Sequence, residues 1–328
     1  MAPVIALGAF TATMDCLPGT PQIQNIIPTT YFGTNLYAAP LAGIIGAIII
    51  YGGGIFYLTH RLRHAVANGE GYGNHKINEP EHNEDMTYVN WKLAVIPLLA
   101  VLIINFVITE CVVWDPDILT PFQQMKGIPL VAAKLKNVVS IWALIISLVV
   151  GIVLALIVGK REIKSVDGLT KILNAGAIGS LLAIMNTASE VGYGNVISQL
   201  PGFADVAHFL INIHIGGTPL VSEAISVTVL AGITGSASGG MSIALELMSQ
   251  DWLTWAQSIG MGPEILHRVA SMASGGLDTL PHNGAVITLL AVCGLSHRES
   301  YKDIFAITLM KTFAVFVIIL IYSVTGLH

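Results

Sequence analysis

Long apolar stretches alternate with polar segments along this chain. Four of them reach the length of about 20 apolar residues that a helix needs to cross a bilayer, at roughly residues 37–59, 92–110, 138–159 and 304–326. Hydrophobic residues make up 54% of the 328 residues and charged residues 11%, whereas about 25% of a soluble domain is charged. The pattern therefore predicts an all-α polytopic membrane protein, surrounded by a lipid bilayer.

Basic residues at the ends of the apolar stretches indicate the orientation of the chain. The run His60-Arg61-Leu62-Arg63-His64 closes the first stretch, and a second run at 160–164 closes the third. Because Lys and Arg collect on the cytoplasmic side, both ends are expected inside the cell. The polar stretch 62–91 has no helical period and is expected to be a cytoplasmic linker. We expect a multi-pass protein of the bacterial inner (plasma) membrane.

Composition and spacing argue against several classes of protein. The net charge is −5, and no basic cluster is large enough for a nucleic-acid partner. Cys16, Cys111 and Cys293 are scattered, odd in number and without metal-ligand spacing, so they are expected to pack as small apolar residues rather than to form a disulfide framework. The glycine-rich strings lack the Gly-Lys-Ser/Thr ending of a phosphate-binding loop. The sequence therefore predicts no cofactor and no resident metal.

Two motifs of the pattern Asp-x-Leu-Pro interrupt apolar sequence: Asp15-Cys16-Leu17-Pro18 and Asp278-Thr279-Leu280-Pro281. A charged residue beside a helix breaker is tolerated at membrane depth only where the backbone lines a cavity enclosed by protein. Each aspartate is expected to be the N-cap of a half-helix, with the proline in its first turn. The sequence leaves open whether either aspartate also titrates. The matched pair indicates a secondary transporter with discontinuous helices.

The apolar stretches that follow the two motifs are related to each other. A basic cluster ends the stretch at 37–59 but begins the stretch at 304–326. The two parts are therefore expected to cross the membrane in opposite senses, as an inverted repeat. The predicted organisation is a remainder of the first repeat at 1–61, the linker at 62–91 and the second repeat at 92–328. Since little sequence precedes Asp15, we expect roughly one hundred N-terminal residues of a full transporter to be missing.

Polar residues closely follow each motif. The N–H groups and positive dipole end of a half-helix can receive a carboxylate, and Thr, Gln and Asn side chains can bind hydroxyl groups. This favours a small anionic substrate with hydroxyl groups. Histidine titrates near physiological pH, so His282 is either a proton carrier or a histidine satisfied by packing. The predicted substrate-binding residues in these segments are Gly19, Thr20, Gln22, Asn25, His282, Asn283 and Gly284.

A third polar segment, residues 186–195, lies within apolar sequence. Its glycines are dense enough to break a helix, so it is expected to form the tip of a re-entrant hairpin; a polar loop outside the membrane is the alternative. The small-residue run at 232–240 is expected to be a packing face or a discontinuous helix rather than a ligand site. In the third segment Ser189, Gly192 and Asn195 are predicted substrate contacts, and Glu190 is a predicted proton carrier.

Both motifs with their flanking residues, DCLPGTPQIQN at 15–25 and GGLDTLPHNGA at 275–285, resemble the gluconate permease family of the ion transporter superfamily. The resemblance covers nearly the whole chain. It implies proton symport of gluconate, a related sugar acid, hydroxybutyrate or another short organic acid. It also implies a scaffold domain, a transport domain with two hairpins that face each other, elevator-type alternating access and a homodimer.

The sequence thus predicts a permease for a small organic monocarboxylate. The carboxylate is expected to dock between the tips that follow Asp15 and Asp278, with the coupled proton carried by Asp15, Glu190, Asp278 or His282. Coupling to sodium is the alternative. Two other interpretations are a passive scaffold and an intramembrane enzyme, which would need the two aspartates to share a proton or a reacting atom.

Overall fold

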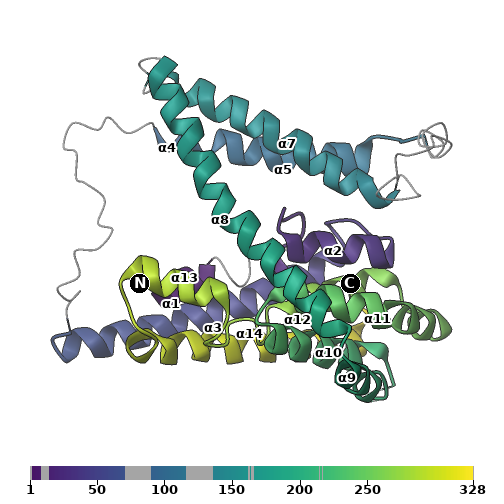
Figure 1. Cartoon of the computed structure of the whole chain (residues 1–328). Coiled ribbons are helices and arrows are strands. Elements are labelled where there is room, and N and C mark those ends of the chain that lie inside the picture. The colour runs from purple at the N-terminus through teal and green to yellow at the C-terminus, as the bar shows by residue number, and fades with distance from the viewer. Residues whose placement is uncertain are drawn as a thin grey trace. The chain divides into compact units, whose positions relative to one another are not determined.

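The computed structural model describes residues 2–8, 15–70, 90–115, 136–161, 163, 166–213, 215 and 217–327. Within these residues the chain is helical and has no strand (Figure 1), which confirms the predicted all-α fold. A π-helical turn, Val107–Cys111, continues α5, and a 3₁₀ turn, Gly159–Arg161, ends α7. The helices are α1 (Ala2–Leu7), α2 (Ile23–Phe32), α3 (Pro40–Ala67), α4 (Trp91–Ala94), α5 (Ile96–Phe106), α7 (Lys136–Val158), α8 (Val166–Ser198), α9 (Pro201–Ile211), α10 (Pro219–Thr234), α11 (Ala237–Ser258), α12 (Pro263–Ser274), α13 (Gly284–Cys293) and α14 (His297–Thr325).

In the described part of the chain, four helical segments are long and apolar enough to cross a membrane, and they coincide with the four predicted stretches. The predicted linker at 62–91 is wrong at its start, because α3 continues as helix to Ala67. The Arg, His and Ala residues there do not break a helix, and they carry α3 beyond its apolar part. Residues 71–89 of this predicted linker lie outside the described residues. The four segments are Pro40–Ala67, Trp91–Thr109, Ile141–Val158 and His297–Thr325.

The chain forms two compact units. Unit 1 comprises Met1–Pro80 and Asn186–His328, and unit 2 comprises Glu81–Met185. The predicted domain at 92–328 is therefore divided between them. The boundary falls inside α8, at the start of the polar segment 186–195.

Unit 2 is built on the packing of α5 against α7. Gly151 permits their close approach, since a β-carbon there would lie 2.5 Å from Cγ2 of Val101. Only 6% of the Trp91–Thr109 segment and 17% of the Ile141–Val158 segment are buried. Apolar helices exposed to this degree need a non-aqueous environment.

Unit 1 contains α3 and α14 packed in opposite directions (Figure 1). Near the end of α3, the hydroxyl of Tyr57 and the guanidinium of Arg61 both donate to Asp303, near the start of α14. Earlier on α3, Gly53 lies against Met310, which is further along α14. The later position on α3 contacts the earlier position on α14, and the earlier position on α3 contacts the later one, so the two helices are antiparallel.

The two halves of unit 1 have the same order of elements. In each, an Asp-x-Leu-Pro motif is followed by a helix of 10 residues, α2 or α13, and then by a long helix, α3 with 28 residues or α14 with 29. The halves also exchange contacts: α1 packs on α13 and α14, whereas α12 packs on α2 and α3. The first motif is therefore held by α12 of the other half, where Ser271 donates a hydrogen bond to the Asp15 carbonyl.

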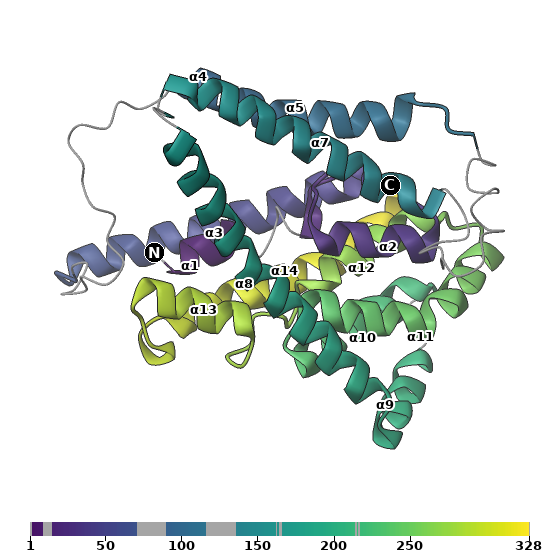
Figure 2. The same cartoon turned by 45° about the horizontal axis from the view of Figure 1, so that its top comes forward.

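The hairpin of unit 1 is formed by α10 and α11, which pack side by side (Figure 2). It turns at Gly235, whose φ is 67°, and Ser236 caps α11 by accepting a hydrogen bond from the Gly239 N–H at 3.1 Å. The predicted hairpin tip at 186–195 is wrong, since α8 is a continuous helix from Val166 to Ser198. Each glycine weakens a helix by about 1 kcal/mol without stopping it, and α8 contains no proline.

Candidate functional site

The first interruption begins at Asp15 and Cys16, which end a helical segment. A turn over residues 17–19 follows, and α2 begins only at Ile23, with Gln22 at its N-cap. Gly19 permits the turn through a φ of 76°, and its N–H donates to the Leu36 carbonyl at 2.9 Å. The predicted N-cap role of Asp15 is therefore wrong: the glycine turn places the aspartate before the interruption.

The second interruption lies between α12, which ends at Ser274, and α13. Here the N-cap of α13 is Asn283, whose Oδ1 accepts hydrogen bonds from the N–H groups of Ala285 and Val286 at 2.7 and 3.1 Å. The predicted cap, Asp278, lies within the preceding turn and does not cap the helix. Its carboxylate faces another helix of the same half instead.

A buried cluster of three charged side chains lies at these interruptions. Nζ of Lys311, on α14, donates to Oδ1 of Asp278 at 2.5 Å. The exposed fraction is 1% for Asp15, 4% for Asp278 and 1% for Lys311. The charge of Asp15 is attracted by Lys311 and repelled by Asp278. The two motifs therefore bring both aspartates to one lysine.

The carboxylate of Asp15 is packed but makes no hydrogen bond to any residue that the structure describes. Neither of its oxygens has a partner among the described residues. Oδ2 lies directly against Gly275, where a β-carbon would overlap it, and the backbone carbonyl of Asp15 accepts a hydrogen bond from Ser271 at 2.8 Å. Desolvating an ionised carboxylate without compensation is costly. Two carboxylates that share one ammonium leave one negative charge in excess, which a proton or a small cation can neutralise.

Two neighbouring side chains of α12 fasten this helix to α2 and to the turn before α3. His267 is hydrogen-bonded through Nε2 to Asn25 and through Nδ1 to Thr34, at 3.0 and 2.6 Å. Arg268 donates from Nε and Nη2 to the Ala38 carbonyl at 3.1 and 2.8 Å. Its Nη1 has no hydrogen-bond partner among the described residues, although the side chain is fully buried.

The tip of the α10–α11 hairpin contacts the start of α13. Nε2 of His282 donates to the Gly232 carbonyl at 2.9 Å, and Nδ2 of Asn283 donates to the Gly235 carbonyl at 2.5 Å. The N-termini of α11 and α13, capped by Ser236 and Asn283, therefore lie close to each other. Where two helix N-termini converge, their positive dipole ends face the same region. The run 232–240, predicted as packing sequence or a discontinuous helix, supplies half of this arrangement.

The predicted substrate contacts outside the α13 cap lie in different surroundings, and Asn25 has structural partners. Nδ2 of Asn25 donates to the carbonyls of Thr20 and Leu36 at 3.0 and 2.9 Å, so its amide holds the loop before α3. Gln22 is exposed, and Gly284 is the first residue of α13. Ser189 and Gly192 are exposed on the continuous helix α8. The side chains of Glu190 and Asn195 lie outside the described residues, so their predicted roles stay predictions.

Lys311 and Arg268 are not among the site residues predicted from the sequence. Lys311 had a usable signal, because a lone lysine inside the apolar stretch at 304–326 is expensive in a membrane and marks a functional position by default. Arg268 had a weaker one, since its neighbours in sequence do not show that it is buried. The fold shows that both side chains are buried beside the motif segments.

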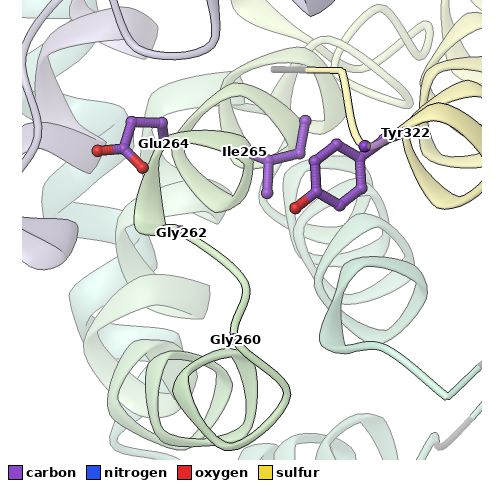
Figure 3. A pocket seen from close by; sticks show the side chains of 6 residues that line it. Gly260, Gly262, Glu264, Ile265 and Tyr322 are labelled. Carbon is purple, nitrogen blue, oxygen red and sulfur yellow. The ribbon is translucent and has the colours of Figure 1, made fainter.

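A pocket of about 220 Å³ lies at the opposite end of α12 from the cluster (Figure 3). Its lining includes Gly260, Gly262 and Glu264, around the start of α12, and Tyr322, near the end of α14. Tyr322 follows Lys311 by 11 positions on a helix, which corresponds to about 16 Å along the axis. The pocket is therefore separate from the charged cluster.

Comparisons with known proteins agree with a membrane carrier. The chain is 48% identical over 332 residues to a protein of Bacillus subtilis (strain 168) named uncharacterized transporter YxjC, and the match covers 98% of this chain and 69% of that protein. No family model matches the chain, and no solved structure matches it. Identity at this level over nearly the whole chain shows common ancestry. The chain belongs to the same family of transporters as YxjC.

Proposed function

We propose that the protein is a secondary transporter that carries a small organic monocarboxylate together with a proton. The observation that carries this proposal is the buried carboxylate of Asp15, which shares Lys311 with Asp278 and has no hydrogen-bond partner among the described residues. A carboxylate in that position is stable when a proton neutralises it. An ionisable side chain between interrupted membrane helices is where carriers bind their coupling ion.

The substrate carboxylate is proposed to bind where the N-termini of α11 and α13 converge. The two positive dipole ends there favour an anion. Arg268 adds a buried positive charge in the same unit, and no ion pair joins it to an acidic residue in the described part of the chain. We further propose gluconate or a short hydroxy acid as the substrate and membership of the gluconate permease family, on the motif resemblance.

Alternating access is proposed to occur by movement of unit 1 as a body. All three members of the charged cluster and both converging helix ends belong to this unit, so the whole site could move together. Unit 2, with its exposed apolar helices α5 and α7, would serve as the scaffold in the bacterial plasma membrane. A homodimer through such a scaffold is part of the same proposal.

Uptake into proteoliposomes tests the function. Radiolabelled gluconate, 3-hydroxybutyrate and an unsubstituted fatty acid of similar size would be compared under an inward proton gradient, an inward sodium gradient, both or neither. We expect uptake of at least one hydroxy acid that follows the proton gradient and is lost in Asp15→Asn. Uptake that requires sodium and ignores the proton gradient would overturn proton coupling, and uptake of none of these acids would overturn the substrate class.

The intramembrane enzyme considered from the sequence is not supported by this geometry. A pair of catalytic aspartates shares a proton through close hydrogen-bonded contact. In this structure Asp278 is paired with Lys311, and the oxygens of Asp15 form no hydrogen bond with it. The arrangement suits the binding of a coupling ion better than a reaction at two carboxylates.

A further inference from the structure

A second acidic side chain, Glu223, is buried in unit 1 outside the cluster at the motifs. It lies in the second turn of α10 and its exposed fraction is 0%. Neither carboxylate oxygen has a hydrogen-bond partner among the described residues, and the same is true of the hydroxyl of Ser226. Residues three positions apart lie on one face of a helix. An acid and a hydroxyl with unused hydrogen-bonding capacity thus share a buried face.

Among the described side chains, which do not include His208 on α9, no charged group compensates Glu223. The helices packed against α10 are α9, α11, α12 and α14, and none of their described charged side chains forms an ion pair or hydrogen bond with Glu223. Asp205 on α9 and Glu246 and Asp251 on α11 are exposed, and His214 lies outside the described residues. On α12, His267 is hydrogen-bonded to Asn25 and Thr34, and Arg268 donates to the Ala38 carbonyl before α3. On α14, Lys311 is paired with Asp278.

The groups next to Glu223 in sequence do not stabilise an ionised carboxylate. Ser222, beside it, donates to the Leu210 carbonyl at 3.3 Å and accepts from Trp252 Nε1 at 3.2 Å, so this hydroxyl is already used. An isolated carboxylate away from water is strongly disfavoured relative to the neutral acid. Three oxygens on one helix face are also too few to surround a metal cation. The ligand that fits this site is a proton.

We infer that Glu223 and Ser226 form a second proton-binding site, and that the transporter carries two protons with each monocarboxylate. The inference rests on the proposed function. Glu223 would take up a proton from the side of higher proton concentration as its carboxylate becomes the neutral acid, and release it from the other side as the carboxylate re-forms. Asp15 would do the same with the first proton. Each cycle would then move one net positive charge.

The position of Glu223 on α10 links it to the substrate site. Further along the same helix, Thr228 donates to the Ala273 carbonyl at the end of α12 at 3.1 Å, and Gly232 lies against Leu277. The helix then ends at the tip that contacts α13. From Glu223 to Gly235 is 12 positions, or about 18 Å along the axis. A rigid helix thus connects the second proton site with the region where the substrate is proposed to bind.

Infrared spectroscopy tests the protonation state without a substrate. The protein in lipid nanodiscs at neutral pH should show carbonyl stretching bands of protonated carboxyl groups, and Glu223→Gln should remove one of them. The matched control is Glu246→Gln, which changes an exposed glutamate of the same hairpin and should leave these bands unchanged. Helical content by circular dichroism confirms folding of each variant. If Glu223→Gln leaves the protonated-carboxyl bands intact, the site is not a proton site.

Accumulation in proteoliposomes tests transport of the second proton, with gluconate as the probe and the membrane potential clamped at zero. Two protons per substrate allow about hundredfold accumulation for about a tenfold proton gradient, and one proton allows about tenfold. We expect about hundredfold accumulation for the native protein and about tenfold accumulation for Glu223→Gln. If both accumulate gluconate equally, the inference fails while the proposed function stands. If no proton-driven uptake occurs in the native protein, both fail, and the infrared result still shows whether Glu223 holds a proton.

Discussion

The two Asp-x-Leu-Pro motifs have the same pattern but different electrostatic surroundings. Asp278 has a cation from its own half, because the long helix that follows it carries Lys311. Asp15 has none, since its own long helix, α3, contains no lysine or arginine before Arg61. The only described lysine or arginine whose charge attracts Asp15 is Lys311 of the other half. Two similar halves therefore produce one paired aspartate and one without a partner of its own.

This difference separates two roles that the motifs alone could not distinguish. A buried carboxylate in an ion pair stays charged and contributes mainly to holding the fold, because removing its partner exposes the full desolvation cost. A buried carboxylate without a hydrogen-bonding partner can change its protonation state at a smaller cost to the fold. Asp278 with Lys311 fits the first role, and Asp15 fits the second.

The strongest test of the comparison removes the shared cation. Lys311→Met leaves two carboxylates near each other without a positive charge, and we expect the free energy of unfolding to fall by about 3–5 kcal/mol. Chemical unfolding in mixed micelles measures the change. Lys302→Met, at an exposed position of the same helix, is the matched control and should change stability by less than about 0.5 kcal/mol. Equal effects of the two substitutions would mean that the cluster is not the source of the loss.

The second test compares the two aspartates directly. Asp278→Asn should lower the free energy of unfolding by about 1–3 kcal/mol, because it breaks the ion pair while leaving Asp15 to accept Lys311. Asp15→Asn should cost less than about 1 kcal/mol, since it removes a carboxylate that makes no hydrogen bond. Unfolding in the same micelles would be measured for both variants. The proposed roles would be exchanged if Asp15→Asn proved the more destabilising of the two.

The sequence predicted the features that depend on local pattern. The four long helices follow from runs of apolar residues, and the two interruptions follow from an acid beside a proline. The hairpin was placed at 186–195 because glycines were dense there, yet the turn occurs at Gly235 and Ser236. Glycine density measures helix weakness, whereas a hairpin also needs a left-handed residue and a cap for the next helix.

The candidate site depended on contacts that local pattern does not contain. Asp15 and Lys311 are far apart in sequence, and only the exchange of helices between the halves brings them together. Asn25 shows that a polar side chain near a motif can also have a structural role. Its amide was a reasonable ligand for hydroxyl groups, but the fold uses it to hold the carbonyls of Thr20 and Leu36. A polar residue near a motif is as often needed to satisfy the interrupted backbone as to bind a ligand.

A third test concerns the close packing of the Asp15 carboxylate against Gly275. Gly275→Ala should lower the free energy of unfolding by about 1–3 kcal/mol, because the added methyl group would overlap Oδ2 of Asp15. Combining it with Asp15→Ala should recover most of that loss, since the shorter side chain leaves room for the methyl group. A double-mutant cycle on unfolding in micelles measures the coupling. Strictly additive effects would show that Gly275 is required for a reason other than this contact.

The smallest expected effect comes from the ion pair on the surface of unit 1, which joins α3 to α14. Arg61 and Asp303 are joined at 2.9 Å, but their side chains are 39% and 19% exposed, so solvent and salt weaken the attraction. Arg61→Gln should lower the free energy of unfolding by less than about 1 kcal/mol, and added salt should reduce the difference further. Unfolding in micelles at low and high ionic strength measures both values. The buried pair of Asp278 and Lys311 should show no such salt dependence, because ions in solution do not screen charges that protein encloses. If Arg61→Gln costs as much as Lys311→Met, then burial is not what distinguishes the two pairs, and the asymmetry between the motifs loses its electrostatic basis.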